Sequence, residues 1–461
     1  MLPTVTELVA QYLRASGYTE TLATFIHEAG LPADTGNGNN TVTIEKILQE
    51  KQTFDLTLNF EKLGVDDKER RWQTIAPSDP TVMDSIPRSN LLSVAQLDLT
   101  LPSNPNLHTY FAATTADRCL HLIDPSSPPS SAVQSYSTFQ DSPILDVAGF
   151  RNRYLLVASM SGSLLLFDTK TEQVLDQRKD HGKYVVKLAT WITDTSILVA
   201  TAGWDANVFL YRLSTDISET PRLGKPIATM SLPTVPETLL FIRAPETARP
   251  ILLLTRRDST FLHYYAVPSS GSDESDLTPL GKQNLAPHSN AWVAFTPSDV
   301  QVSPVDASVV AVATSSTPHM KLLVVKLLLS PEKVASLDGY QIPDSGPITQ
   351  ASQARADLLL QNREEAAILV NVSTMAPQTA YSTPRLVWRP DGSGIYVSSD
   401  DGIVRGFEAH TGKLVATLEA HEPGSKIRCL CAGKVKLDLV DNREILLTGG
   451  FDQKLVLWKT A

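Results

Sequence analysis

The stretch Ile445–Trp458, with the sequence ILLTGGFDQKLVLW, decides the fold of this 461-residue chain. Two apolar runs, 445–447 and 455–458, flank a Gly-Gly-Phe-Asp turn, and this arrangement predicts a β-hairpin. From about residue 90 onward, short apolar runs alternate with turns rich in Pro, Gly, Ser and Asp, which indicates a mainly all-β chain. The hairpin is therefore interpreted as one unit of a repeated β architecture.

This hairpin resembles one blade of a WD-repeat β-propeller, in which a turn Asp precedes a strand that ends on Trp. The resemblance implies a buried hydrogen-bond relay that holds each blade together and has no catalytic role. In the last repeat the relay residues are His421, Thr448, Asp452 and Trp458. In another well-patterned repeat they are His181, Thr201, Asp205 and Tyr211. Tyr in place of Trp keeps a hydrogen-bond donor and an aromatic body.

Eight repeat units can be recognised, although most of them are degenerate. They span residues 110–124, 155–168, 197–211, 251–265, 309–325, 357–372, 394–407 and 445–458. Eight units give about 46 residues each, close to the usual WD-repeat period, so eight blades are favoured and seven stays open. The last blade lacks an outer strand, and we expect the segment Arg71–Ile75 to supply it and close the ring.

The N-terminal residues follow a helical period instead. Thr4 and Glu7 fit a capping box, Gly17 suits a left-handed helix end, and Thr19 can cap a second helix. The pattern of Leu8-Val9, Tyr12-Leu13, Gly17-Tyr18, Thr21, Phe25 and Glu28 resembles the LisH motif over about residues 4–31. That resemblance implies a homodimer, a compact four-helix unit. The contacts expected are Leu8, Val9, Tyr12, Leu13, Tyr18, Leu22 and Phe25.

A helical hairpin that docks on its own propeller is the alternative, because two short helices cannot bury their apolar stripes alone. The expected domains are a LisH motif at 1–33, a linker with a short helical extension at 34–70, and a WD-repeat propeller at 71–461. The extension begins near Ile44, but its heptads are not sustained, so a long coiled coil is not expected.

Composition narrows the function. The net charge is −10 and basic residues are scattered, so direct nucleic-acid or anionic-membrane binding is not expected. Only three cysteines occur, which favours a reducing compartment, the cytoplasm or the nucleus. No signal peptide is apparent, and no apolar run approaches the ~20 residues of a membrane span. Cys429 and Cys431 are interpreted as apolar residues on one strand face rather than metal ligands.

The sequence contains none of the common catalytic or phosphate-binding signatures. We therefore expect no enzyme activity, no cofactor and no metal. In WD-repeat proteins, partners dock on the top face at the channel mouth, through loop residues near the turn Asp. By this resemblance the candidate partner-binding residues are Trp204, Arg256, Arg257, Asp400 and Phe451. Alternatively, Trp204 and Phe451 only cover their own hairpins.

The sequence thus predicts a non-enzymatic scaffold that dimerises through LisH and recruits protein partners on a propeller, as a subunit of a larger complex. One alternative is a propeller enzyme or small-ligand receptor, which requires charged side chains with shifted pKa values at the channel mouth. Another is a ubiquitin-ligase substrate receptor. Phe167–Lys170 loosely resembles the Trp-Asp-x-Arg box with which some WD-repeat receptors engage the adaptor of cullin-4 ligases, although Lys lacks the bidentate geometry of Arg. Corepressor-like and dynein-related subunits stay open.

Overall fold

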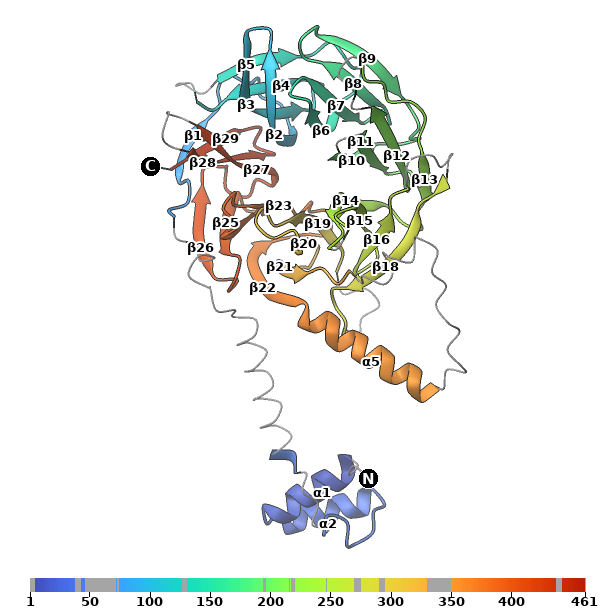
Figure 1. The fold of residues 1–461 in the computed structure, drawn as a ribbon. Helices are drawn as coiled ribbons and strands as arrows, with labels where there is room; N and C mark the ends of the chain where they lie inside the picture. The colour runs from blue at the N-terminus through green and yellow to red at the C-terminus, as the bar shows by residue number, and fades with distance from the viewer. Residues whose placement is uncertain are drawn as a thin grey trace. The chain divides into compact units, whose positions relative to one another are not determined.

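A computed structural model gives the architecture of the chain. It describes residues 5–37, 43–45, 72 and 74–460, with gaps at 127–130, 194–195, 215, 217–219, 246, 269–274, 290–294, 330–349 and 437–441. The contacts divide the chain into two units, Met1–Glu69 and Arg70–Ala461. Within the residues described, the larger unit consists of seven sheets arranged radially as a β-propeller, and their strands are antiparallel except for one short parallel pairing (Figure 1).

The seven sheets are here numbered as blades in chain order, each from its inner to its outer strand. Blade 1 has β2 (Leu91–Leu101), β3 (Asn104–Thr115), β4 (Leu120–Asp124) and β5 (Ser131–Tyr136). Blade 2 has β6 (Ile144–Phe150), β7 (Tyr154–Ser159), β8 (Leu164–Asp168) and β9 (Gln173–Arg178). Blade 3 has β10 (Val185–Ile192), β11 (Ser196–Gly203), β12 (Asn207–Ser214), β13 (Ala228–Ser231) and a short parallel strand β17 (Ser275–Asp276).

Blade 4 has β14 (Pro236–Arg243), β15 (Pro250–Arg256), β16 (Phe261–Ala266) and β18 (Thr278–Asn284). Blade 5 has β19 (Pro297–Val302), β20 (Val309–Thr314), β21 (His319–Lys326) and β22 (Ile368–Pro377). Blade 6 has β23 (Leu386–Trp388), β24 (Gly394–Val397), β25 (Ile403–Glu408) and β26 (Leu414–Glu419). Blade 7 has β27 (Ile427–Lys436), β28 (Asn442–Gly450), β29 (Leu455–Lys459) and β1 (Asp79–Val82).

The structure therefore has seven blades rather than the favoured eight. The unit expected at residues 357–372 is not a blade. Its first part lies in a helix, α5 (Gln350–Ala366), and its second part in β22, which pairs with β21 as the outer strand of blade 5. A long insertion between β21 and β22 raises the mean number of residues per blade. From the sequence alone, this insertion is interpreted as an eighth repeat.

The core is divided among the gaps between blades. Seven clusters of buried apolar side chains each join two neighbouring blades, and the cluster of Leu91, Phe111, Ile445 and Leu457 joins blade 7 to blade 1. The middle strands are therefore apolar on both faces, because each face packs against a different neighbour. In β7 every residue from Tyr154 to Ser159 is buried.

The ring is closed by the N-terminal strand, but not by the segment that the sequence indicated. Residues 79–82 form β1 and pair antiparallel with β29, so that Pro80 lies opposite Trp458. The four residues of β1 are exposed and include a Pro, which gives them little strand signal in the sequence. The predicted closing segment, Arg71–Ile75, instead contains Trp72, which packs on blade 6.

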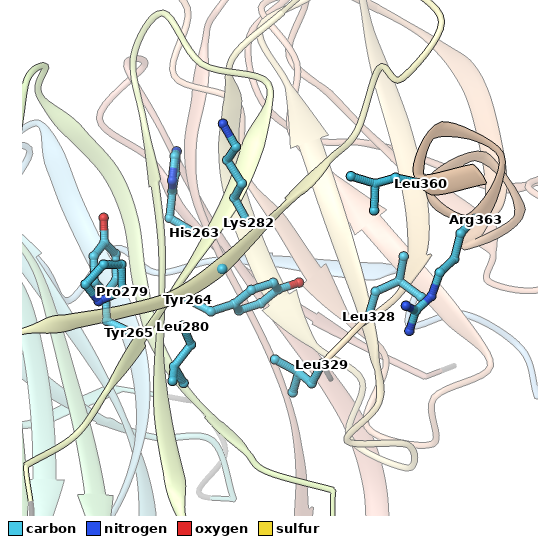
Figure 2. Close-up of a pocket in the computed structure, with 11 residues that line it drawn as sticks. His263, Tyr264, Tyr265, Pro279, Leu280, Lys282, Leu328, Leu329, Leu360 and Arg363 are labelled. Carbon is cyan, nitrogen blue, oxygen red and sulfur yellow. The ribbon is translucent and has the colours of Figure 1, made fainter. Parts of the chain in front are cut away.

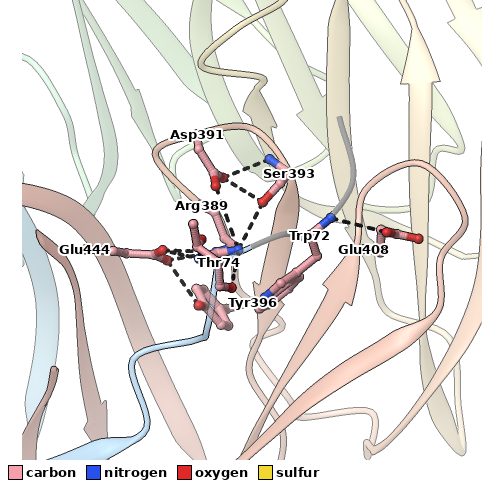
Figure 3. A network of polar contacts seen from close by, with 8 residues as sticks. All are labelled: Trp72, Thr74, Arg389, Asp391, Ser393, Tyr396, Glu408 and Glu444. Atoms are coloured by element: carbon pink, nitrogen blue, oxygen red, sulfur yellow. Dashed lines mark hydrogen bonds and ion pairs between the residues drawn. The ribbon is translucent and has the colours of Figure 1, made fainter. Parts of the chain in front are cut away.

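Trp72 belongs to a polar network that ties blades 6 and 7 together (Figure 3). Its ring lies against Gly394 and Gly406, where any side chain would clash, and 4.3 Å from the guanidinium carbon of Arg389. Arg389 is fully buried. It forms a bidentate ion pair with Glu444 of β28 and donates to the Thr74 hydroxyl at 2.6 Å. The network therefore holds Trp72 and Thr74, which precede β1, against blades 6 and 7.

In the N-terminal unit the structure describes the helices α1 (Val5–Ala15) and α2 (Thr19–Glu28). Gly17 between them has φ of +75°, the left-handed conformation predicted from the sequence. The predicted cap on α2 was wrong: the N-cap residue is Tyr18, and its side chain makes no capping hydrogen bond. Thr4 and nearly all of the expected helical extension lie outside the described residues.

Candidate functional site

The relay of blade 7 pins the turn between β28 and β29. His421 Nδ1 lies 3.0 Å from an Asp452 oxygen, and Nε2 lies 2.8 Å from the Thr448 hydroxyl. Trp458 donates its indole N–H to the same hydroxyl at 2.9 Å. Burial lowers the pKa of His421 although Asp452 opposes the shift, so the ring is neutral and donates from Nδ1. The relay is therefore structural, with every polar atom engaged inside the blade.

The relay of blade 3 differs at its fourth member. His181 lies 3.0 Å from Asp205 and 2.9 Å from the Thr201 hydroxyl, as in blade 7. The Tyr211 hydroxyl, however, donates to Asp180 at 2.9 Å. Asp180 in turn accepts two hydrogen bonds of 2.7 Å from the Nε and Nη2 atoms of Arg178. The fourth member of this relay therefore donates to the Arg178–Asp180 ion pair, whereas Trp458 in blade 7 donates to the relay threonine.

Four of the five candidate partner-binding residues occupy one structural position. Trp204, Arg257, Asp400 and Phe451 each precede the Asp of a turn between the second and third strands. These turns and the loops that lead into the next inner strand form one face, here called the top face. Trp204 and Phe451 are each 43% exposed, which is high for residues of their size. The fifth candidate, Arg256, ends β15 and donates to Thr234 at 3.1 Å.

The first group on this face is the Trp204 patch, which consists of Tyr184, Trp204, Glu237 and Arg257. The rings of Trp204 and Tyr184 stack with centroids 5.5 Å apart. The Arg257 guanidinium lies over the Trp204 ring at 5.5 Å and is paired with Glu237. Because the patch joins blades 3 and 4 and keeps its aromatic surface open, it has the composition of an interface anchor.

The second group is the Phe451 patch, which consists of Tyr381, Asp400, Lys426, Arg428 and Phe451. The Arg428 guanidinium lies 5.6 Å from the Phe451 ring centroid, as Arg257 lies over Trp204. Lys426 pairs with Asp400 at 3.1 Å. Tyr381, in the loop before blade 6, is 90% exposed. The top face therefore presents two separate pairs of an aromatic ring with an arginine.

The central channel opens beside the Phe451 patch. It encloses a cavity of about 270 Å³ lined by residues from the innermost strands of all seven blades and from Arg385 just before β23. Six of these strands begin with a β-bulge, and in blade 7 the bulge falls at Arg428. The charged residues of the lining are Asp146, Lys187, Asp299, Arg385 and Arg428.

These charges are unevenly paired. Lys187 and Arg385 approach the same carboxylate, Asp299, at 3.7 and 3.5 Å. Asp146 accepts the backbone N–H groups of Val147 and Leu188, and desolvation raises its pKa. Burial, followed by repulsion from Arg385, lowers the pKa of Arg428. The channel thus has charged groups with shifted pKa values, the feature that the small-ligand alternative required.

The sequence did not single out the channel charges. Each comes from a different blade, tens of residues from the next, and none is adjacent to the turn motifs. The available signal was a charged residue near the start of an otherwise apolar strand, as in Arg428 before Cys429-Leu430. Cys429 itself is buried, and desolvation raises its pKa to about 12, so it behaves as an apolar residue.

The segment that resembles a cullin-4 adaptor box is engaged within blade 2. Phe167 is 1% exposed, and Asp168 receives the guanidinium of Arg153 at 2.5 and 2.7 Å. Asp168 also accepts the backbone N–H of Lys170 at 2.9 Å. Phe167 and Asp168 are therefore engaged in contacts within blade 2.

A second cavity, of about 620 Å³, lies between the outer part of blade 4 and helix α5 (Figure 2). Tyr264, Leu280 and Leu328 line it, with Leu360 and Arg363 contributed by α5. Burial and the nearby Arg256 and Lys282 lower the pKa of His263 on its wall to about 4. The wall is thus mainly apolar, with a neutral histidine.

In the N-terminal unit, the residues expected to form dimer contacts are incompletely covered. Leu22 is buried between the helices, whereas Leu8, Val9, Leu13 and Phe25 are half-buried. Tyr12 and Tyr18 are exposed. The helix pair therefore retains open apolar surface on both of its helices.

Within the described part of the chain, no group of three or more His, Cys, Asp or Glu side chains is placed to hold a metal ion. None of the helices described is both long and apolar enough to cross a membrane.

Comparison with known families identifies the architecture. The family model described as the UCP007778 beta-propeller domain matches residues 102–459, and the UCP007778 LisH domain matches residues 4–33. The chain belongs to the UCP007778 family. The matches confirm the LisH and propeller assignments made from the sequence. A search of curated proteins found no match.

The propeller is also similar to a solved structure described as "Crystal Structure of Mitotic Checkpoint Complex". The alignment has a TM-score of 0.51 and 14% sequence identity, and it covers 84% of this chain and 96% of the other. At this identity the similarity shows the fold alone. A LisH domain and a β-propeller in one chain of the UCP007778 family support a protein-interaction scaffold.

Proposed function

We propose that this protein is a non-enzymatic adaptor that dimerises through its LisH helices and recruits protein partners on the top face of its propeller. The observation that carries the proposal is the pair of exposed aromatic rings, Trp204 and Phe451, each beside an arginine. Aromatic residues and Arg are enriched in protein interfaces, and Trp, Tyr and Arg are enriched among the few residues that dominate the binding energy. The cytoplasm or the nucleus is the proposed location.

The apolar surface that α1 and α2 leave open supports dimerisation. Two helices of 11 and 10 residues are too short to be stable without further burial, and a second copy would cover Tyr12, Leu13 and Phe25. A dimer would present two propellers to one target and raise the apparent affinity without new contacts. Light scattering should give twice the chain mass for the full-length protein and the single mass for residues 70–461. Two monomeric results would remove the dimer from the proposal.

The recruiting surface can be tested with Trp204→Ala. We expect this variant to lose partners in affinity capture with mass spectrometry, while its melting temperature stays within a few degrees of the wild type. Ile192→Ala is the matched control, because Ile192 is 59% exposed but lies at the opposite end of strand β10. If the two variants retain the same partners, Trp204 does not belong to the docking surface.

A further inference from the structure

Arg428 differs from the other charged residues of the channel because it has no opposite charge. Among the residues that the structure describes, it forms no hydrogen bond or ion pair, and its close neighbour is the face of Phe451. It is half-buried, and Arg385 is near enough to repel it. A desolvated guanidinium without a counter-charge is unfavourable in the free protein, and an anion placed beside it would relieve that cost.

The remaining charges of the channel do not supply this anion. Asp299 is shared between Lys187 and Arg385, and Leu386 also donates its backbone N–H to it at 3.1 Å. Asp146 is occupied by two backbone donors. The lining therefore has three basic side chains and two carboxylates, although the whole protein has a net charge of −10.

We propose that the channel mouth beside Arg385 and Arg428 binds an anionic side-chain group, a carboxylate or a phosphate, that a partner polypeptide presents there. Two arginines can donate to the oxygens of either group in a bidentate manner. This inference rests on the proposed function, since it identifies the chemistry of a partner that docks on the top face.

The surroundings favour a peptide over a folded element or a free ion. The cavity of about 270 Å³ admits single side chains but not an α-helix, whose diameter with side chains is about 10 Å. Exposed Phe451 and Tyr381 lie in the loops around this mouth and provide apolar surface for the residues that flank the anion. An extended acidic or phosphorylated segment fits this combination.

The test is fluorescence anisotropy on the full-length protein with three labelled peptides. They are hexaglutamate, hexaglutamine, and a hexapeptide of Gln with one central phosphoserine. We expect hexaglutamate or the phosphopeptide to bind and hexaglutamine not to bind, and the tighter of the two anionic peptides identifies the source of the anion. Arg428→Gln should weaken binding at least tenfold, and Arg428→Lys should weaken it less. Arg118→Gln changes an exposed arginine in the turn between β3 and β4 of blade 1, outside the channel and both aromatic patches, and should change binding less than threefold.

Three outcomes would overturn the inference. The first is that neither anionic peptide binds. The second is that Arg428→Gln and Arg118→Gln weaken binding equally, which would indicate a general charge effect. The third is that inorganic phosphate or free glutamate competes as well as the peptides, which would indicate a small-ligand site. Trp204→Ala separates this inference from the proposed function, because it should reduce partner capture but retain hexaglutamate binding.

Discussion

Blade 7 and blade 5 have similarly buried strands, yet only blade 7 of the two has a side-chain relay within the described residues. Leu447 and Val312, in the second strands of the two blades, are both fully buried. In blade 7 the next turn is held by His421, Asp452 and Thr448. In blade 5 the Thr314 hydroxyl bonds only locally, to Lys321 and Ser316.

This difference shows that a blade can form without the side-chain relay. Apolar burial against two neighbours is sufficient to form blade 5, since cores like those of blade 7 flank it on both sides. The relay adds side-chain hydrogen bonds to the turns of the top face, where blade 7 presents Phe451 and blade 3 presents Trp204. The pattern is thus strongest in two blades that carry the exposed aromatic rings.

The largest expected effect concerns the polar network of Trp72, Arg389 and Glu444 rather than the relay. Arg389→Met leaves the Glu444 carboxylate in a largely buried site without its ionic partner, and it should lower the free energy of unfolding by about 3–5 kcal/mol. Urea denaturation followed by tryptophan fluorescence measures this loss. The double variant Arg389→Met with Glu444→Met should recover much of it. If the free energy of unfolding of Arg389→Met lies within about 1 kcal/mol of the wild-type value, the network does not contribute to holding the segment before β1.

The comparison of the two blades is tested directly by removing matched hydroxyls. Thr448→Val orphans the Trp458 indole N–H and His421 Nε2 and should cost about 2–4 kcal/mol. Thr314→Val removes only local bonds and should cost about 1 kcal/mol. Denaturation midpoints of both variants give the difference. Equal losses would mean that the relay contributes no more than an ordinary turn hydrogen bond.

The relays also predict a pH dependence. Burial lowers the pKa of His421 and of His181 in the folded protein, whereas the unfolded side chains titrate near 6.5. Below that pH the unfolded state binds more protons, so stability should fall as the pH decreases from 7 to 5, by at most about 1.4 kcal/mol per pH unit for each histidine. Replacing both histidines with Gln should flatten this part of the curve measured by thermal unfolding. An unchanged slope would assign the acid sensitivity to other groups.

The smallest effect is expected at the fourth relay position of blade 3. Tyr211→Phe keeps the buried ring and removes one hydroxyl, while Asp180 keeps Arg178 as its partner. The loss should be about 1 kcal/mol or less. Trp458→Phe should cost more, because it leaves a space in the core and removes the donor to Thr448. Urea unfolding of the pair tests this order, and a larger loss for Tyr211→Phe would reverse our interpretation of the two relays.

The sequence by itself determined the class of fold and the local chemistry of the best repeats. Alternating apolar runs predict strands, the order of His, Thr, Asp and Trp over 421–458 predicts the relay, and the helical period of residues 4–31 predicts the LisH pair. These signals are local: each depends on residues that are near one another along the chain or on a short repeated pattern. Because Trp204 and Phe451 each directly precede the turn Asp of their repeat, the sequence also placed them at equivalent positions.

Only the tertiary structure decided the number of blades, the closing strand and the composition of the channel. The helical insertion before β22 is indistinguishable from a weak repeat by spacing, and β1 becomes a strand only because β29 offers it an open edge. Arg385, Arg428 and Asp299 come from three different blades, and they meet because ring closure brings the first strand of every blade to one axis. Charges that converge in this way have no common sequence pattern, since their proximity depends on the closed ring and not on their spacing in the chain.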